Sequence, residues 1–154
     1  KNIVPVDGTT ITDVAAAALR LREVGVENVL VSLGGNGLLS VSEEGVLNAV
    51  VPQVEVKSTV GAGDSLLGGF VVGTVKEMPY AERVRLAAAC GTASVMLEGT
   101  AVADKAAAMA VTSGMRQERN GQDDKNNPLC QKHRVSGVHN RAAFAVGVFY
   151  RRHT

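Results

Sequence analysis

Apolar residues recur along residues 10–112 at spacings that predict alternating helices and strands. Residues 10–24 have helical spacing and are followed by Gly25, a residue common just past a helix end. Residues 29–33 then form a short apolar run rich in β-branched side chains. Such a run after a helix is typical of a parallel sheet that has helices on both faces. We therefore interpret it as a central strand of a parallel sheet, buried on both faces.

The next segment is predicted to form a pair of short strands. After the glycine-rich turn 34–37, strands are predicted at 38–41 and 46–51, separated by the turn Glu43-Glu44-Gly45. Pro52 ends the second strand, because a proline cannot donate a hydrogen bond to a neighbouring strand.

Three helices are predicted farther along. Residues 66–75 are apolar almost all round, which is typical of a helix buried on every side. Residues 80–97 and 104–111 form the other two helices. The order of elements predicts an α/β fold built in layers.

The pattern changes near residue 112. Residues 1–112 carry a net charge of −4, whereas residues 113–154 carry +5 and lack regular periodicity. The polar, turn-rich stretch 116–128 has the composition of a disordered or loosely held segment. We therefore expect a domain at 1–112 and a basic tail at 113–154, with the apolar residues 142–150 isolated inside it.

Composition restricts the classes of function. Hydrophobic residues make up 45% of the chain and the net charge is only +1, which gives no sign of a nucleic-acid or membrane partner. Two cysteines provide no disulfide framework, and no apolar run approaches 18 residues, so we expect a cytoplasmic protein. Cys90 lies in an alanine-rich run and is expected to be a small buried core residue.

Gly61-Ala62-Gly63-Asp64 is the segment with the clearest chemical potential. Glycines allow a sharp turn, and the N–H groups at the start of the following helix form an anion site. A carboxylate on such a turn can accept the proton of a hydroxyl that attacks a phosphoryl group. The tetrapeptide alone leaves a second interpretation open, in which it is a tight turn and Asp64 is a capping side chain.

Residues 58–70, which contain this tetrapeptide, resemble the C-terminal signature of ribokinase-like (PfkB) carbohydrate kinases. Residues 31–37 resemble the family's nucleotide motif at a strand end, and residues 87–94 and 98–100 resemble the segment flanking its adenine pocket. The resemblance implies an α/β fold, a three-layer αβα sandwich of which this chain holds only the C-terminal portion.

The resemblance also implies an activity and the residues that perform it. The chain would transfer the γ-phosphate of ATP to a sugar hydroxyl in the presence of Mg²⁺. Asp64 would be the catalytic base, and Gly61, Ala62 and Gly63 would bind the developing charge on the phosphoryl group. The residues implied in nucleotide binding are Ser32, Leu33, Gly34, Gly35, Asn36, Gly37, Gly63 and Asp64. The partners would be ATP and a small sugar phosphate, with a homodimer formed by the full-length parent.

Ser58 departs from the pattern of many relatives, in which an aspartate at this position helps to hold potassium. We therefore predict no metal site in this chain. Ser58-Thr59-Val60 is instead similar to the hexose-phosphate branch of the family, which indicates a fructose phosphate as the acceptor, with tagatose 6-phosphate or another hexose phosphate as the alternative.

The N-terminal half of the family pattern, which supplies the sugar site, is not found in this sequence. We therefore expect the chain alone to be inactive. A non-catalytic nucleotide-binding fragment is the alternative from another functional class.

Two other motifs are weaker. Residues 34–37 lack the following helix and the full G-x-G-x-x-G of a dinucleotide site. A structural zinc site has four ligands, whereas the tail offers only three loosely spaced residues that could bind zinc, Cys130, His133 and His139. We therefore interpret them as unrelated tail residues.

Overall fold

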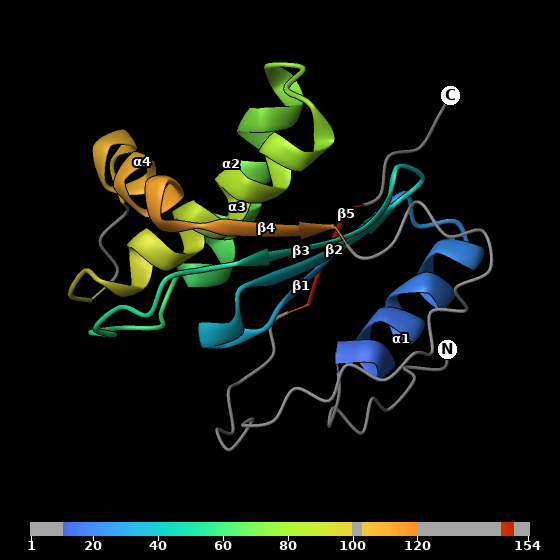
Figure 1. Ribbon diagram of the computed structural model, residues 1–154, viewed down its shortest axis with the longest axis horizontal. Helices are drawn as coiled ribbons and strands as arrows, with labels where there is room; N and C mark the ends of the chain where they lie inside the picture. The colour runs from blue at the N-terminus through green and yellow to red at the C-terminus, as the bar shows by residue number, and fades with distance from the viewer. Residues whose placement is uncertain (1–10, 100–102, 120–145, 150–154) are drawn as a thin grey trace.

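A sheet of five strands, ordered β4-β3-β2-β1-β5, forms the centre of the molecule and has helices on both faces (Figure 1). The computed structural model describes residues 11–99, 103–119 and 146–149. The elements, in chain order, are α1 (Ile11–Glu23), β1 (Asn28–Ser32), the 3₁₀ turn η1 (Gly34–Asn36), β2 (Leu38–Ser42), β3 (Gly45–Val50), α2 (Ala62–Val75), α3 (Tyr80–Val95), α4 (Lys105–Gly114), β4 (Arg116–Arg119) and β5 (Val146–Phe149).

The expectation of a parallel sheet is wrong for the described strands. Every neighbouring pair is antiparallel: β1 with β2, β2 with β3, β3 with β4 and β1 with β5. The physical reason lies in the connections, because tight turns join β1 to β2 and β2 to β3 and can only reverse the chain. The prediction that β1 is a central strand is confirmed, since Val29, Leu30 and Val31 are all buried.

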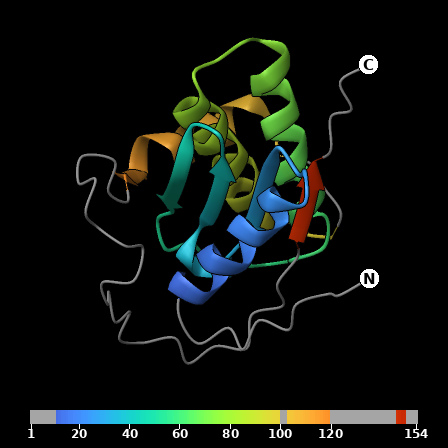
Figure 2. The same ribbon diagram turned by 90° about the vertical axis from the view of Figure 1, so that its right-hand side faces the viewer.

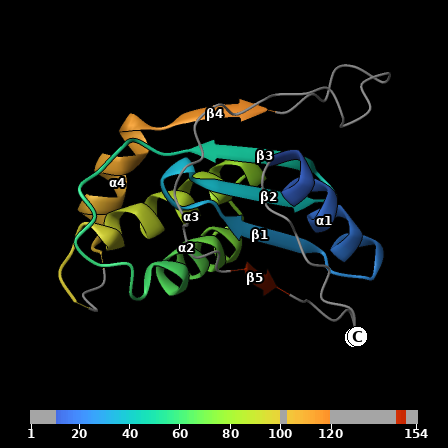
Figure 3. The same cartoon turned by 90° about the horizontal axis from the view of Figure 1, so that it is seen from below.

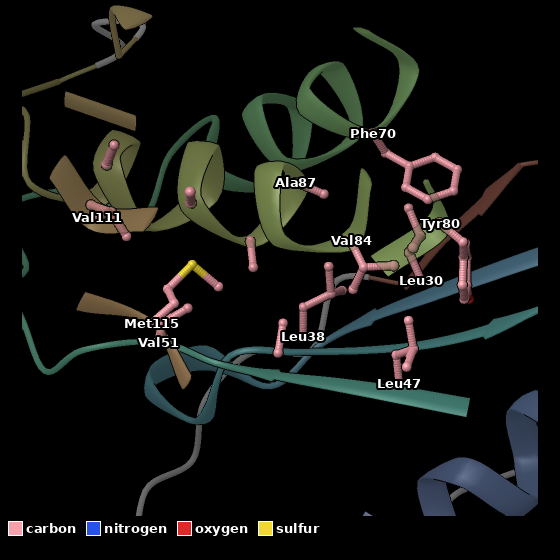
Figure 4. Packing of buried hydrophobic residues seen from close by; sticks show 14 residues of the cluster. Leu30, Leu38, Leu47, Val51, Phe70, Tyr80, Val84, Ala87, Val111 and Met115 are labelled. Carbon is pink, nitrogen blue, oxygen red and sulfur yellow. The ribbon is translucent and has the colours of Figure 1, made fainter. Parts of the chain in front are cut away.

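Successive side chains of β1 and β2 enter two different hydrophobic clusters. Leu30 and Leu38 contact the cluster under α2, α3 and α4, where Phe70 and Tyr80 lie close to the sheet (Figure 4). The other face of the sheet packs against α1. That second cluster contains Val14, Ala15, Ala18, Val29, Val31, Leu33, Leu39 and Val41. The continuous apolar run of β1 is therefore explained by helices on both faces of the sheet.

Helix α2 lies at the β1–β5 side of the sheet, and α4 lies at the β4 side (Figure 2). The expectation that α2 is buried on every side is wrong. Gly69, Phe70 and Gly73 are buried, whereas Val72 is 46% exposed and Val75 is 77% exposed. Its glycines let α2 approach α3 closely on one side, whereas the side that carries Val72 and Val75 is exposed.

Helix α4 crosses the boundary expected at residue 112. It continues to Gly114, and the side chain of Met115 is buried in the cluster under the helices. Strand β4 then pairs with β3, so Arg116–Arg119 form a sheet strand where a loosely held segment was expected. The remaining limits of the expected tail stay a prediction.

None of the helices in the described ranges is both long and apolar enough to cross a membrane.

Candidate active site

The N-terminus of α2 is formed by a glycine in the left-handed conformation. Gly61 has φ of 79° and precedes the first helical residue, Ala62. The Ala62 N–H donates to the Thr59 carbonyl at 3.4 Å, and the Ser65 N–H donates to the Gly61 carbonyl at 2.9 Å. Within the described ranges, the N–H groups of Gly63 and Asp64 have no acceptor. These two amides lie in the first turn of a 14-residue helix, where the helix dipole favours an anion.

Asp64 lies in this first turn and is exposed. Its carboxylate makes no hydrogen bond or ion pair with any described residue. A capping aspartate accepts a backbone N–H of its own helix, as Asp104 does from Ala107 at 2.8 Å at the start of α4. Asp64 differs from Asp104 in this respect, so the geometry favours a carboxylate that is available to a ligand over a capping role.

The chain entering α2 is held against the C-terminal end of α3. The N–H groups of Lys57 and Ser58 both donate to the Val95 carbonyl, at 2.8 Å and 3.3 Å. Farther along, the Val60 N–H donates to the Ser58 hydroxyl at 3.3 Å. Helix α3 also packs closely against the start of α2, since a Cβ on Gly91 would lie 3.3 Å from the Ala62 carbonyl oxygen. Helix α3 thus fixes where the Gly61–Asp64 turn sits.

The glycine turn after β1 is closed by its own backbone. The Leu33 N–H donates to the Gly37 carbonyl at 2.8 Å, and the Gly37 N–H donates to Gly34 at 3.0 Å. Gly37 has φ of 96°, and a Cβ there would lie 1.9 Å from the Ala49 carbonyl. The hairpin itself therefore requires glycine at 37. Leu33 is buried in the core, whereas Gly34, Gly35 and Asn36 are exposed.

The two glycine turns lie at the same end of the sheet, where β1 ends and α2 begins (Figure 3). The linker 51–60 runs between them. Its Gln53 side-chain amide donates to the Gly35 carbonyl at 3.2 Å and so ties the linker to the first turn. Sequence reasoning missed Gln53, whose only signal was a side-chain amide directly after Pro52.

Helix α3 has little free surface for the wall of an adenine pocket. In the segment 87–94, all side chains except those of Cys90 and Thr92 are buried in the core. Met96, which is 40% exposed, follows α3 directly and lies next to the linker held by Val95. The surface that α3 leaves exposed therefore lies mainly at its C-terminal end.

Ligands for a metal ion are not clustered. No group of three or more His, Cys, Asp or Glu side chains that could hold a metal occurs in the described part of the chain. Cys130, His133 and His139 lie outside it. Cys90 was expected to be a buried core residue but is only half-buried. Its partial burial raises the pKa of the thiol.

Sequence comparison identifies the chain's relatives. The family described as pfkB family carbohydrate kinase matches residues 1–107. A 1-phosphofructokinase of Bacillus subtilis (strain 168) is 40% identical over 94 residues, which are 59% of this chain and 31% of the relative. A 1-phosphofructokinase of Escherichia coli (strain K12) is 41% identical over 93 residues, 60% of this chain and 30% of the relative. The chain thus spans about a third of the length of the curated relatives it matches.

Solved structures agree with this match. Phosphofructokinase-2 from Escherichia coli, in complex with substrates and products, superimposes with a TM-score of 0.64 at 33% identity, covering 68% of this chain and 34% of that one. Ribokinase from Arabidopsis thaliana, in complex with ribose and ATP, gives a TM-score of 0.60 at 26% identity, covering 67% and 34%. The described fold is therefore similar to a part of ribokinase-like kinases.

Proposed function

Because this chain belongs to the pfkB family of carbohydrate kinases, we propose that it carries the nucleotide-binding and general-base part of an ATP-dependent kinase that phosphorylates a fructose phosphate. In this proposal the described layers are the C-terminal portion of a ribokinase-like αβα sandwich. The observation that carries the proposal is the exposed Asp64 carboxylate, which pairs with no described residue, beside first-turn N–H groups of α2 that have no acceptor among the described residues.

The first step of the proposed chemistry is recognition of the phosphates. The N–H groups of Gly63 and Asp64 lie at the positive end of the helix dipole, and neither donates to an acceptor in the part of the chain that the structure describes. Hydrogen bonds of this kind strengthen as negative charge develops on the transferred group. The turn 34–37 and the C-terminal end of α3, which the exposed Met96 follows, border the same end of the sheet and would contact the rest of ATP.

The second step is proton removal. Asp64 lies in the same helical turn as the two free amides, so a sugar hydroxyl placed against the phosphoryl group would also be within reach of the carboxylate. The carboxylate would accept the hydroxyl proton as the new O–P bond forms.

The described residues include no group of three or more ligand side chains that could hold magnesium without a nucleotide. Magnesium usually binds through substrate phosphates and one or two carboxylates, so in the whole enzyme it would arrive with the nucleotide.

The acceptor is assigned by likeness to the two bacterial 1-phosphofructokinases. Tagatose 6-phosphate or another hexose phosphate is the alternative acceptor within the same family. A second candidate, a nucleotide-binding chain without turnover, is favoured by one observation, namely that the match covers only about a third of each relative.

Calorimetry with ATP on this chain tests the nucleotide site, and a kinase assay with fructose 1-phosphate, carried out on a complete enzyme that contains this segment, tests the activity. Binding that weakens when the free amides at the α2 N-terminus are disturbed supports the nucleotide site, and phosphorylation of the sugar identifies the activity. Binding without turnover selects the second candidate. No binding of ATP by the folded chain would refute both.

A further inference from the structure

The linker 51–60 joins β3 to α2 and runs between the two glycine turns (Figure 3). Its start is anchored by the buried side chain of Val51, and its end is anchored by backbone hydrogen bonds to the C-terminal end of α3. Between these anchors, the Gln53 side chain donates its hydrogen bond to the Gly35 carbonyl. The linker thus reaches the 34–37 turn through a side-chain amide.

Gln53 holds a peptide unit that is also held from its other side. The Gly35 carbonyl and the Asn36 N–H belong to the same planar, trans peptide unit and therefore point in opposite directions. The carbonyl accepts from the Gln53 Nε2 at 3.2 Å, and the N–H donates to the Leu33 carbonyl at 3.1 Å. These two hydrogen bonds together fix the orientation of the peptide unit within the turn.

The backbone on either side of this peptide unit is easily rotated. Rotation of the unit changes ψ of Gly35 and φ of Asn36, and glycine and asparagine tolerate unusual backbone angles better than most residues. Both residues are exposed, so the core does not hold them. A Cβ added at Gly35 would meet, within 4 Å, the two polar atoms of the Gln53 amide, each at 3.8 Å. The Gln53 amide is therefore the tertiary contact that restrains this part of the turn.

We propose that Gln53 is a positioning residue of the nucleotide site, whose side-chain amide holds the 35–36 peptide unit in the orientation in which the 34–37 turn receives ATP. The inference rests on the proposed function, from which it takes the contact of this turn with ATP. Gln53 acts through the turn, so the fraction of molecules with the correct orientation sets the apparent affinity for ATP. Without the hydrogen bond, the apparent Kd for ATP rises about two- to tenfold, the range that one net hydrogen bond spans.

Three substitutions test the inference. Gln53→Met keeps the length of the side chain and removes the donor, whereas Gln53→Asn keeps the amide and shortens its reach by one methylene. The matched control is Val56→Met, which places the same methionine at another linker position, where the side chain is 57% exposed and has no polar atom to lose.

The first measurement is amide hydrogen exchange without nucleotide. In both Gln53 variants, exchange of the Asn36 N–H should accelerate at least about threefold, whereas the N–H groups between β1 and β2 keep their protection. The melting midpoint should change little, because Gln53 is exposed. The control should match the unsubstituted chain in both measurements.

The second measurement is ATP binding by calorimetry, with Kd expected to rise about two- to tenfold in both Gln53 variants and to stay unchanged in the control. In a complete enzyme that contains this segment, Gln53→Met should raise KM for ATP and leave kcat unchanged. A residue that only stabilises the fold would lower the melting midpoint without this change in KM.

The exchange measurement needs no nucleotide, so it separates failure of this inference from failure of the proposed function. Unchanged exchange at Asn36 in both Gln53 variants would overturn the inference, because Gln53 would not hold the peptide unit. Faster exchange with unchanged ATP affinity would also overturn it, as would an equal loss of affinity in Val56→Met. Absence of ATP binding by the folded, unsubstituted chain would refute the proposed function and, with it, the role of Gln53.

Discussion

Asp64 combines exposure with a position beside two free helix amides, so its side chain can be changed without disturbing packing. In a complete enzyme that contains this segment, Asp64→Asn should lower kcat by about 10²–10⁴-fold, or about 3–5.5 kcal/mol of barrier, because the proton acceptor is lost. The unfolding midpoint, measured on the same preparation, should be unchanged because Asp64 forms no cap. A capping role would give the reverse: lower stability with near-normal turnover.

Gly61 and Gly63 are separated by one residue but differ in backbone. Gly61 has φ of 79°, so Gly61→Ala should cost about 1 kcal/mol or more of stability through strain, even though its Cβ would meet nothing within 4 Å. Gly63 lies within helical backbone, so Gly63→Ala is the matched control and should be neutral or slightly stabilising. Chemical denaturation compares the two, and ATP calorimetry should show weaker binding for Gly61→Ala. Equal stabilities would show that the turn relaxes without strain.

At the scale of elements, the contact of α2 with α3 depends on glycine at 69. A Cβ at Gly69 would lie 2.9 Å from the Cys90 sulfur and 3.0 Å from the Ala87 Cα, so Gly69→Ala should force the helices apart and cost about 1–3 kcal/mol. Gly68 has nothing within 4 Å, and Gly68→Ala should stabilise the helix by about 0.5–1 kcal/mol. Thermal melts of both variants test the contrast. A stable Gly69→Ala protein would mean that the Cys90 side chain yields at little cost.

Tyr80 connects α3 to the sheet through a hydrogen bond of 2.7 Å with Ser40, which is fully buried. Tyr80→Phe should cost about 1–3 kcal/mol because the Ser40 hydroxyl loses its partner. Adding Ser40→Ala should recover part of that loss, and a double-mutant cycle measures the coupling. Additive effects of the two substitutions would show that the bond contributes nothing.

The same tyrosine predicts a pH dependence. Burial raises the pKa of Tyr80 above its usual value of 10.0, against the opposing effect of the hydrogen bond with Ser40. The folded state therefore holds the phenol proton more tightly than the unfolded state. Its contribution to stability is complete below pH 10 and is lost as the pH rises from there through the folded pKa. Urea midpoints measured at increasing alkaline pH should fall less steeply in Tyr80→Phe. Parallel curves would assign the alkaline loss to other groups.

For the whole molecule, two truncations separate the fold from its tail. A chain ending at Thr112 loses the buried Met115 and strand β4, so it should lose about 2 kcal/mol or more. A chain ending at Arg119 keeps both and loses β5, which pairs with β1 at only four positions, so its melting transition should stay close to that of the full chain. Calorimetric scans compare the three proteins. A large destabilisation of the longer truncated chain would show that residues after Arg119 stabilise the core.

Local sequence determined the elements whose signals are short-range. The hairpin of β2 and β3 follows from two short apolar runs on either side of the turn Glu43-Glu44-Gly45, and the end of α1 follows from Gly25. The glycines and the carboxylate of the 61–64 turn were found because anion binding at a helix start depends on neighbouring residues. Local sequence also identified the pfkB family, through motifs each confined to about a dozen residues.

Tertiary structure alone decided features that depend on distant residues. Strand direction depends on which strands become neighbours, so the apolar run of β1 could not distinguish an antiparallel sheet covered by helices from a parallel one. Exposure of α2 depends on what covers its outer face, which its own composition cannot specify. The roles of Gln53 and Met115, and the placement of β5 beside β1, depend on contacts across 18 or more residues. Such contacts leave no periodic signal in the segments that make them.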